Sequence, residues 1–320
     1  MSSNSIPKVD LTGLRSSLPG GDRWEAAREV VAAALHSHGC FEAVFPSPST
    51  DLREEMFGSA APELFSLPLE SKLRSISDDA YHGYFGQIPH LSFESLIING
   101  VDSPIAVQDF TRLMWPPEGN STFCNNVTAF AEPLRELVEM VQRMIFQSLG
   151  VDQKQQDSFA SSITHSLRLA EYGVPLNQDT KIALDAHLDP HLLSVICQHK
   201  IGGLEIQAMD DGNWIVVPPA PASVTVIAGQ SLQAWSNMRV RAPTHRVRML
   251  GKEKRFSVNY SIRPSRNSIV KSPAELGEDD DRPLLYKPFN YTEFVEFIYS
   301  EKGMGMSPKD AFNSYCRLEN

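Results

Sequence analysis

Two histidines and one carboxylate occur in an order that suits a metal ion. His187 and Asp189 are separated by one residue, and His245 follows farther along the chain. Two histidines and a carboxylate form the facial triad, which leaves three coordination positions open on a non-haem Fe(II) ion. Arg255 and Ser257 follow shortly after His245, and a guanidinium beside a hydroxyl can hold a carboxylate by charge-assisted hydrogen bonds. The pattern predicts an Fe(II) site next to a site for a carboxylate-bearing cosubstrate.

The third metal ligand has two candidates. His-x-Asp and Arg-x-Ser both recur by chance, so only their combined order is informative. Period-two alternation places His187 and Asp189 on one face of an extended segment. His191 shares this alternation, but its Cα would lie roughly 13 Å from that of His187 if the segment stays extended. An intervening proline could bend the path, so His191 stays an alternative to His245; His199 is predicted to end a core strand.

The elements that must position these residues change in type halfway along the chain. Helical apolar spacing predicts one helix from a capping box at Asp22 to a stop at Gly39, a second over about 51–65 and a third over about 127–149. Short strands separated by turn residues then suggest a sandwich or barrel. The predicted strands span 165–173, 192–199, 203–208, 213–217, 223–228, 244–249 and 255–262. The tail from about Tyr291 is predicted to be helical.

Composition limits the partners of the chain. Its 320 residues are 42% hydrophobic and 21% charged, with a net charge of −10, which argues against nucleic-acid or anionic-membrane surfaces. Four widely spaced cysteines suggest free thiols in a reducing compartment. No apolar stretch approaches the ~18–20 residues that span a bilayer, and the first residues lack a signal-peptide pattern. We expect a cytoplasmic monomer that acts on a small-molecule substrate.

The order His-x-Asp, His-Arg-Val, Arg-x-Ser resembles that of the plant 2-oxoglutarate/Fe(II)-dependent dioxygenases. Nearly the whole chain shares the resemblance. Similar segments are Ile6–Leu11, His38–Glu42, His82–Tyr84, Trp115–Pro116, Gly203–Gln207 and Trp214–Val217. The likeness is greatest to a short subgroup that contains glucosinolate side-chain oxygenases, auxin-oxidising dioxygenases and glycoalkaloid hydroxylases.

The resemblance implies a mainly β fold with helices, in which a double-stranded β-helix (jelly-roll) core is flanked by N-terminal and C-terminal helices. We expect a single domain over 1–320. Within it, 1–160 would form a helix-rich N-terminal layer, 161–265 the catalytic core and 266–320 a C-terminal helical tail.

The resemblance also implies roles for individual residues. His187, Asp189 and His245 would be the catalytic Fe(II) ligands, and Arg255 with Ser257 would hold the far carboxylate of 2-oxoglutarate.

Tyr172 matches the tyrosine of the family's Asn-x-Tyr motif and would add a phenol to the same carboxylate. Ala170 replaces the Asn of that motif, so a hydrogen bond to the near end of the cosubstrate must come from elsewhere or be absent. Leu188, Gln230 and Met238 also depart from common family residues, which affects expected loop geometry but not the ligand set.

Substrate-pocket residues are predicted from an aromatic-rich stretch that walls the substrate site in this family, and from the strand of the cosubstrate arginine. The candidates are Phe85, Phe93, Phe110, Trp235 and Tyr260. Each could instead be a core residue.

The predicted reaction consumes O2 and decarboxylates 2-oxoglutarate to succinate while a small specialised metabolite is oxidised, most simply by hydroxylation. Desaturation or ring formation by the same oxidant, and auxin-type hormone oxidation, are alternatives. A carboxylate at Asp189 makes halogenation unexpected, because a Gly or Ala there would open a halide site. The alternative from another class is a catalytically silent jelly-roll binding protein, against which the intact ligand set argues.

Overall fold

The computed structural model describes residues 5–76, 83–277 and 283–318. Their strands form two large sheets and one small one, so the double-stranded β-helix core is confirmed. The major sheet has the order β1 (Lys8–Asp10), β2 (Cys40–Val44), β10 (Ser223–Ala228), β7 (Leu193–Gln198), β12 (Arg255–Pro264), β5 (Ile163–Tyr172), β4 (Phe93–Asn99) and β3 (Tyr84–Phe85). The minor sheet has the order β6 (Ile182–His187), β11 (His245–Arg248), β8 (Leu204–Gln207) and β9 (Trp214–Val216). A two-stranded sheet pairs β13 (Ile269–Val270) with β14 (Phe289–Asn290).

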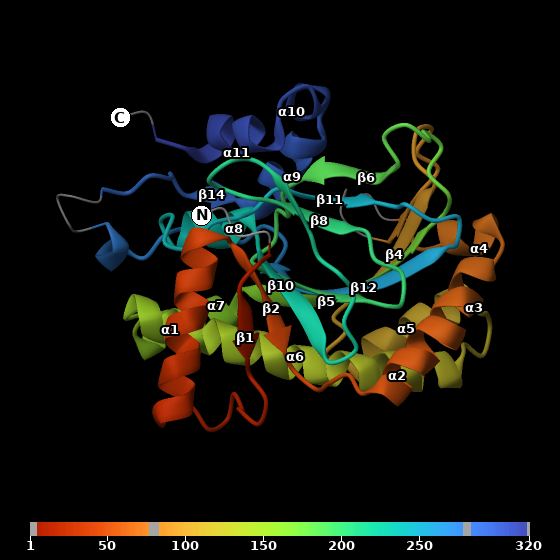
Figure 1. The fold of residues 1–320 in the computed structure, drawn as a ribbon, viewed down its shortest axis with the longest axis horizontal. Coiled ribbons are helices and arrows are strands. Elements are labelled where there is room, and N and C mark those ends of the chain that lie inside the picture. Colours follow the sequence, from red (N-terminus) through yellow and green to blue (C-terminus); the bar gives the residue numbers. More distant parts are fainter. Residues whose placement is uncertain (1–4, 77–82, 278–282, 319–320) are drawn as a thin grey trace.

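Helices cover the sheets on two sides (Figure 1). Before the core lie α1 (Asp22–Ser37), α2 (Thr50–Glu55), a π-helical turn (Met56–Ala60), α3 (Ala61–Ser66), α4 (Leu69–Leu73), α5 (Pro104–Met114), α6 (Ser121–Leu149) and α7 (Gln153–Ser161). Within and after it lie α8 (Gln230–Trp235), a 3-10 turn (Ala274–Leu276), α9 (Tyr291–Tyr299), α10 (Glu301–Met304) and α11 (Pro308–Cys316).

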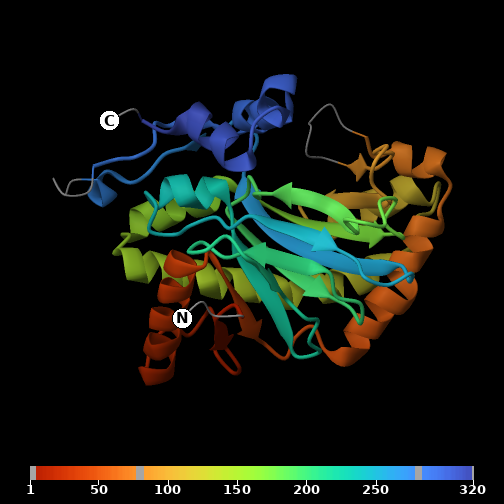
Figure 2. The same ribbon diagram turned by 45° about the horizontal axis from the view of Figure 1, so that its top comes forward.

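The major sheet is enclosed on both faces. Every residue of β7 and β10 is buried, which is the pattern of strands covered on both sides. Helix α6 runs along one face of this sheet, and the minor sheet lies over the other (Figure 2). The C-terminal helices α9 to α11 lie on the side of the molecule opposite α6 (Figure 1). The space between the two sheets is therefore where inward-facing side chains from both sheets meet.

Several expected elements differ in their bounds. The first helix begins after Gly21 with no side-chain cap, so the capping box predicted at Asp22 does not form. The long helix begins at Ser121, six residues earlier than predicted, because the Asn120 side chain accepts a hydrogen bond from the Phe123 amide and caps it. Strands β4 and β6 and helices α5 and α7 were not predicted from the apolar pattern of the sequence.

Gly39 is required at the end of the first helix for two reasons. Its φ is +69°, the left-handed conformation that glycine adopts without strain, and its amide donates to the Ala34 carbonyl. A Cβ at this position would also lie 2.3 Å from the Arg241 backbone oxygen. The predicted helix stop at Gly39 is confirmed.

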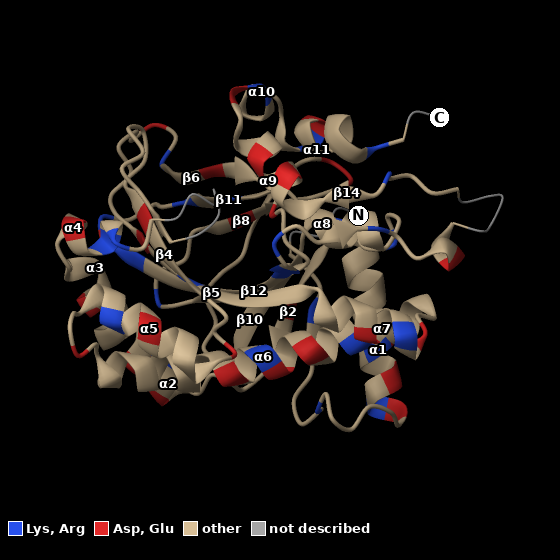
Figure 3. Cartoon of the chain, turned by 180° about the vertical axis from the view of Figure 1, so that it is seen from behind, with Lys and Arg blue, Asp and Glu red and all other residues tan. Residues whose placement is uncertain are grey.

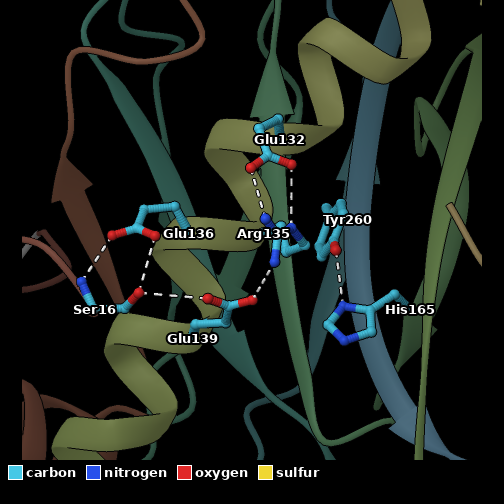
Figure 4. Close-up of polar contacts among 7 residues, drawn as sticks. All are labelled: Ser16, Glu132, Arg135, Glu136, Glu139, His165 and Tyr260. Atoms are coloured by element: carbon cyan, nitrogen blue, oxygen red, sulfur yellow. Dashed lines mark hydrogen bonds and ion pairs between the residues drawn. The ribbon is translucent and has the colours of Figure 1, made fainter. Parts of the chain in front are cut away.

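A polar network fixes α6 to the N-terminal segment (Figure 4). The Ser16 amide and hydroxyl donate to the Glu136 carboxylate over 2.7 and 2.9 Å. The adjacent Arg135 donates to Glu132, one turn earlier in α6, over 2.6 Å and to Glu139, one turn later, over 2.7 Å. These contacts hold the helix that supports the major sheet.

Acidic and basic side chains are interspersed on the outer helices α1, α6 and α7 (Figure 3). No helix among the described residues is both long enough and apolar enough to cross a bilayer.

Candidate metal centre and cosubstrate pocket

Three potential metal ligands meet on the minor sheet. His187 ends β6 and His245 begins β11, and the two are direct cross-strand partners with ring centroids 4.2 Å apart. Oδ1 of Asp189 lies 3.7 Å from Nε2 of each histidine. One potential ligand atom from each residue lies within 4.8 Å of the others. The structure thus brings together residues far apart in the sequence, and their donor set fits Fe(II).

The histidines are held with Nε2 toward the centre. Nδ1 of His187 lies 2.8 Å from the Asp185 carbonyl, and Nδ1 of His245 lies 3.4 Å from that of Pro243. A protonated Nδ1 that donates to a carbonyl leaves Nε2 with its lone pair for a metal. Burial, with a contribution from the neighbouring His245, lowers the pKa of His187 to about 4. The imidazole of His187 is therefore neutral at physiological pH.

His191, the alternative third ligand, lies on the other side of the carboxylate. Its Nδ1 is 4.0 Å from Oδ2 of Asp189, the oxygen that faces away from the two other histidines. The Ser194 hydroxyl donates to the same Oδ2 over 2.5 Å. Burial opposes ionisation of Asp189, but the imidazoles of His245, His191 and His187 and this hydroxyl hold its pKa below the usual value. Asp189 therefore presents Oδ1 to the metal position while Oδ2 is occupied by the protein.

The segment that carries Asp189 is bent rather than extended, and the start of α8 holds the bend. The Gln230 amide donates to the Asp189 carbonyl over 2.8 Å, and the Ser231 amide donates to that of His191 over 3.1 Å. A Cβ on Gly229 would lie 2.1 Å from the His191 oxygen. The close approach of the two backbones needs glycine at this position. Gln230, which departs from the family pattern, supports the loop through its backbone.

The outer face of the minor sheet fixes the register that positions His245. Glu205 is buried, and its carboxylate accepts a 2.7 Å hydrogen bond from Arg246 and a 2.8 Å one from Arg248. The Arg246 guanidinium also lies 3.9 Å above the Trp214 ring. These contacts join β11 to β8 and β9. Because sheet side chains alternate, the residue before Arg246 must face the opposite, inner side.

A buried guanidinium faces the centre from the major sheet. Arg255 is 1% exposed, and its Nη2 donates to Oε1 of Gln198 over 3.1 Å. The guanidinium lies 4.6 Å from the centre of the Tyr172 ring. Nε and Nη1 find no hydrogen-bond partner among the described residues. Buried donors are almost always satisfied, so these two fit an arriving carboxylate. Ser257, two residues along β12, lines the same pocket.

Two of the predicted aromatic residues lie near this pocket. Phe93 packs 4.9 Å from the Tyr172 ring, and Phe85 packs 6.1 Å from Phe93. Phe110 instead packs against Phe123, at 6.1 Å, between α5 and α6. Phe110 is therefore a core residue of the helical layer.

The structure corrects the prediction for Tyr260 and Trp235. Tyr260 donates to or accepts from Nδ1 of His165 at 2.8 Å, on the α6 face of the major sheet (Figure 4). Trp235 packs against Phe146 and Phe159. Neither residue lines the metal pocket. Tyr260 was predicted on the wrong face of β12, because the odd-numbered residues of this strand face the metal pocket.

Sequence reasoning missed four residues of the site. Arg168 and Asn259 line the pocket, and alternation along their strands from Tyr172 and Ser257 could have found them. Gln198 and Ser194 gave no such signal. Gln198 acts on Arg255, which is distant in sequence, and Ser194 acts on Asp189, which lies around a bend of the chain.

Comparison with known proteins agrees with this geometry. The 2OG-Fe(II) oxygenase superfamily matches residues 164–264, and the N-terminal domain of the non-haem dioxygenases in morphine synthesis matches residues 6–94. The chain belongs to the 2OG-Fe(II) oxygenase superfamily. It is an oxidoreductase of the 2-oxoglutarate-dependent dioxygenase type, which uses Fe(II), 2-oxoglutarate and O2 to oxidise a small molecule.

Individual relatives refine this placement. A probable 2-oxoglutarate-dependent dioxygenase, AOP1 of Arabidopsis thaliana, is 37% identical over 302 residues, which are 93% of this chain and 98% of the relative. A probable inactive dioxygenase, AOP2 of the same plant, is 29% identical over 98% of both chains. The crystal structure of a rice dioxygenase for auxin oxidation superposes with a TM-score of 0.79 at 25% identity, over 98% of this chain and 100% of the other. The predicted subgroup resemblance is confirmed.

Proposed function

We propose that His187, Asp189 and His245 bind the Fe(II) ion and that Arg255 binds the far carboxylate of 2-oxoglutarate. The observation that carries this proposal is the convergence of three ligand atoms within 4.8 Å of one another in the pocket that Arg255 lines. Arg255 brings two buried donors that lack partners among the described residues. A carboxylate is the group that a planar guanidinium binds best.

The residues around the cosubstrate have separate tasks. Gln198 holds Arg255 by accepting from Nη2, and Tyr172 supports the guanidinium with its ring. Ser257 adds a hydroxyl on the same face of β12. Together these groups would set the position of the dicarboxylate, and the bound Fe(II) would supply the redox chemistry with O2. Apolar side chains of both sheets also line the pocket and would limit the access of water to the reacting carbon.

The proposed outcome is hydroxylation of a small specialised metabolite. Phe85 and Phe93 are proposed to wall the entrance, because Phe93 packs on Tyr172 and Phe85 is 40% exposed beside it. Auxin-type oxidation is a second candidate, which the likeness to the rice auxin-oxidising dioxygenase favours. A panel of substrates with mass-spectrometric detection of products distinguishes hydroxylation (+16 Da) from desaturation or ring formation (−2 Da).

Two measurements test the ligand assignment. Anaerobic addition of Fe(II) and 2-oxoglutarate should give the visible charge-transfer band of the chelated complex, and air should then yield succinate. Asp189→Ala should lose both signals, while Asp109→Ala, which removes an exposed carboxylate on α5, should keep both. Succinate release by Asp189→Ala at the rate of the parent chain would reject the assignment. A wild-type chain that gives neither signal would instead be a silent binding protein.

We further propose that residues 1–320 act as one domain and as a cytoplasmic monomer. The four cysteines are buried and free, as expected in a reducing compartment. Strands β1 and β2 of the N-terminal part extend the major sheet, which supports a single domain. Light scattering after gel filtration and fractionation of the native tissue test these two proposals.

A further inference from the structure

An amide side chain with an unpaired oxygen borders the metal pocket on the side of the major sheet. Asn259 of β12 lines this pocket together with the three proposed metal ligands and Arg255. Its Oδ1 is buried and has no hydrogen-bond partner among the described residues. Buried polar atoms of native proteins are almost always paired. A partner for this amide is therefore expected to arrive with a ligand.

Either end of the amide can meet that ligand. The last side-chain torsion of an asparagine is broad and roughly two-fold, so a half-turn exchanges the oxygen and the nitrogen at little cost. The nitrogen supplies two donors and the oxygen is an acceptor. The chemistry of the ligand then decides which of the two atoms faces the pocket.

Strand register places Asn259 near the metal end of the pocket. Four residues of β12 separate it from Arg255, which corresponds to roughly 13 Å of strand. Two residues farther along, Ser261 pairs with Ser194 of β7. The Ser194 hydroxyl donates to the carboxylate of Asp189. Asn259 therefore lies between the level of Arg255 and the level of Asp189, and it is nearer to the second.

A dicarboxylate that spans these two levels needs hydrogen bonds at both of its ends. In the proposed function Arg255 binds the far carboxylate, and the near carboxylate and its neighbouring keto oxygen face the metal position. A carboxylate that gives one oxygen to a metal keeps a second oxygen, and it is costly to bury that oxygen without a donor. The near end of 2-oxoglutarate therefore needs a protein donor at the metal end of the pocket.

The hydroxyl groups of the pocket lie toward the other end. Tyr172 pairs with Arg255 across the strands, and its ring supports the guanidinium. Ser257 lies on β12 between Arg255 and Asn259, and its hydroxyl is proposed to serve the far carboxylate. Both hydroxyl groups are therefore assigned to the far end of the cosubstrate.

Among the described residues that line the pocket, the neighbours of Asn259 offer no second amide or hydroxyl at this level. Its cross-strand partner on β7 is Ile196, and the pocket residue opposite Ser257 on β5 is Ala170. Arg168 of β5 pairs with Asn259, but it also interacts with other residues of the chain. Asn259 is thus a neutral donor with no committed partner for its oxygen at the metal end.

We propose that Asn259 binds the near end of 2-oxoglutarate, with Nδ2 donating to the carboxylate oxygen that does not face the metal. This inference deepens the proposed function and rests on it, since it assumes that Arg255 and the metal hold the two ends of the cosubstrate. A donor on one side of the near carboxylate would fix the orientation of the chelating end. One defined coordination position would then be left for O2.

The first experiment measures the affinity for 2-oxoglutarate through the charge-transfer band of the anaerobic, Fe(II)-loaded protein. Asn259→Leu keeps the approximate size of the side chain and removes its donor. It should weaken 2-oxoglutarate binding by roughly 10- to 100-fold, as expected for one lost hydrogen bond to a charged group. Fe(II) affinity without 2-oxoglutarate should stay within about threefold of the parent chain. Asn125→Leu, the same change at an exposed position of α6, is the control and should keep the parent affinity.

The second experiment compares the position of the same band at saturating 2-oxoglutarate. The transition moves an electron from the metal into the π* orbital of the 2-oxo acid, and a hydrogen bond to the near end lowers the energy of that orbital. Asn259→Leu should therefore move the band to shorter wavelength, whereas Asn259→Gln, which keeps an amide, should move it less. The band reports only the molecules that bind the cosubstrate, so partial loss of folded protein does not alter its position.

Two results would overturn the role of Asn259. One is an affinity of Asn259→Leu for 2-oxoglutarate within about threefold of the parent chain. The other is weaker binding with an unmoved band, because a contact at the far end or a general loss of structure would leave the band where it is.

Failure of this inference differs from failure of the proposed function. Absence of the charge-transfer band in the parent chain would contradict the metal and cosubstrate assignment. A normal band in the parent chain that Asn259→Leu reproduces in affinity and position would contradict only the contact from Asn259.

Discussion

Ser194→Ala is the most informative single change at the metal centre. The Ser194 hydroxyl donates to Oδ2 of Asp189 over 2.5 Å, and both residues are buried. This contact leaves Oδ1 facing His187 and His245 at 3.7 Å. Without the hydroxyl, the carboxylate can rotate and its buried Oδ2 loses a charge-assisted partner. The variant should therefore bind the metal more weakly while all three ligands remain.

The magnitude follows from the kind of contact that is lost. A hydrogen bond to a charged group contributes about 1.5–3 kcal/mol, which corresponds to roughly 10- to 150-fold in affinity. Removal of partners that orient metal ligands typically costs about 10–100-fold. We expect Fe(II) affinity to fall within this range. The metal-free variant should also unfold a few degrees lower, because a buried oxygen is left unsatisfied.

The assay is anaerobic Fe(II) titration, followed by Co(II) titration as an oxygen-stable check. Ser194→Thr keeps the hydroxyl and should bind nearly as well as the parent. Ser166→Ala removes a different buried hydroxyl of the major sheet, one that bonds to Ser261, and should leave metal affinity unaltered. If Ser194→Ala binds Fe(II) within threefold of the parent chain, the orienting role of the hydroxyl is refuted.

Three further predictions concern the supports of the site. Gly229→Ala should cost about 1–3 kcal/mol of stability and weaken metal binding, because its Cβ would lie 2.1 Å from the His191 oxygen. Thermal denaturation measures the loss, and Gly58→Ala is the control because Gly58 has open space around it. Equal melting temperatures of the two variants would contradict the reasoning. Gln198→Leu removes the acceptor of the hydrogen bond from Arg255 Nη2. The loss of one hydrogen bond to a charged group should raise KM for 2-oxoglutarate by about 10-fold, and kcat should change less. An unchanged KM would show that this contact is dispensable. Burial lowers the pKa of His191 to about 3, below its ordinary 6.5. As pH falls, the His191 imidazole is therefore protonated in the unfolded chain before it is protonated in the folded chain. The metal-free protein should lose stability as pH falls below 6.5. Chemical denaturation at pH 7.5 and 5.0 measures this loss, and His191→Gln should lessen it.

The sequence determined the chemistry of the centre. Residue type alone supplied two imidazoles, a carboxylate and a guanidinium in a recognisable order, and alternation explains why Arg255 and Ser257 share a face. Helical periodicity predicted α1 and most of α6, and turn residues separated most strands of the core. These features depend on residues that are close to one another in the chain, so they can be predicted from a single sequence.

The tertiary structure decided how those groups are used. His245 rather than His191 meets His187, because cross-strand pairing of β6 and β11 outweighs nearness in sequence. The support of Asp189 by Ser194, and of Arg255 by Gln198, depends on a bent loop and on strand order in the sheet, which local pattern does not encode. The parity of β12 placed Asn259 and not Tyr260 in the pocket. Long-range packing fixes such details, because a one-residue change of register moves every side chain to the other face of a sheet.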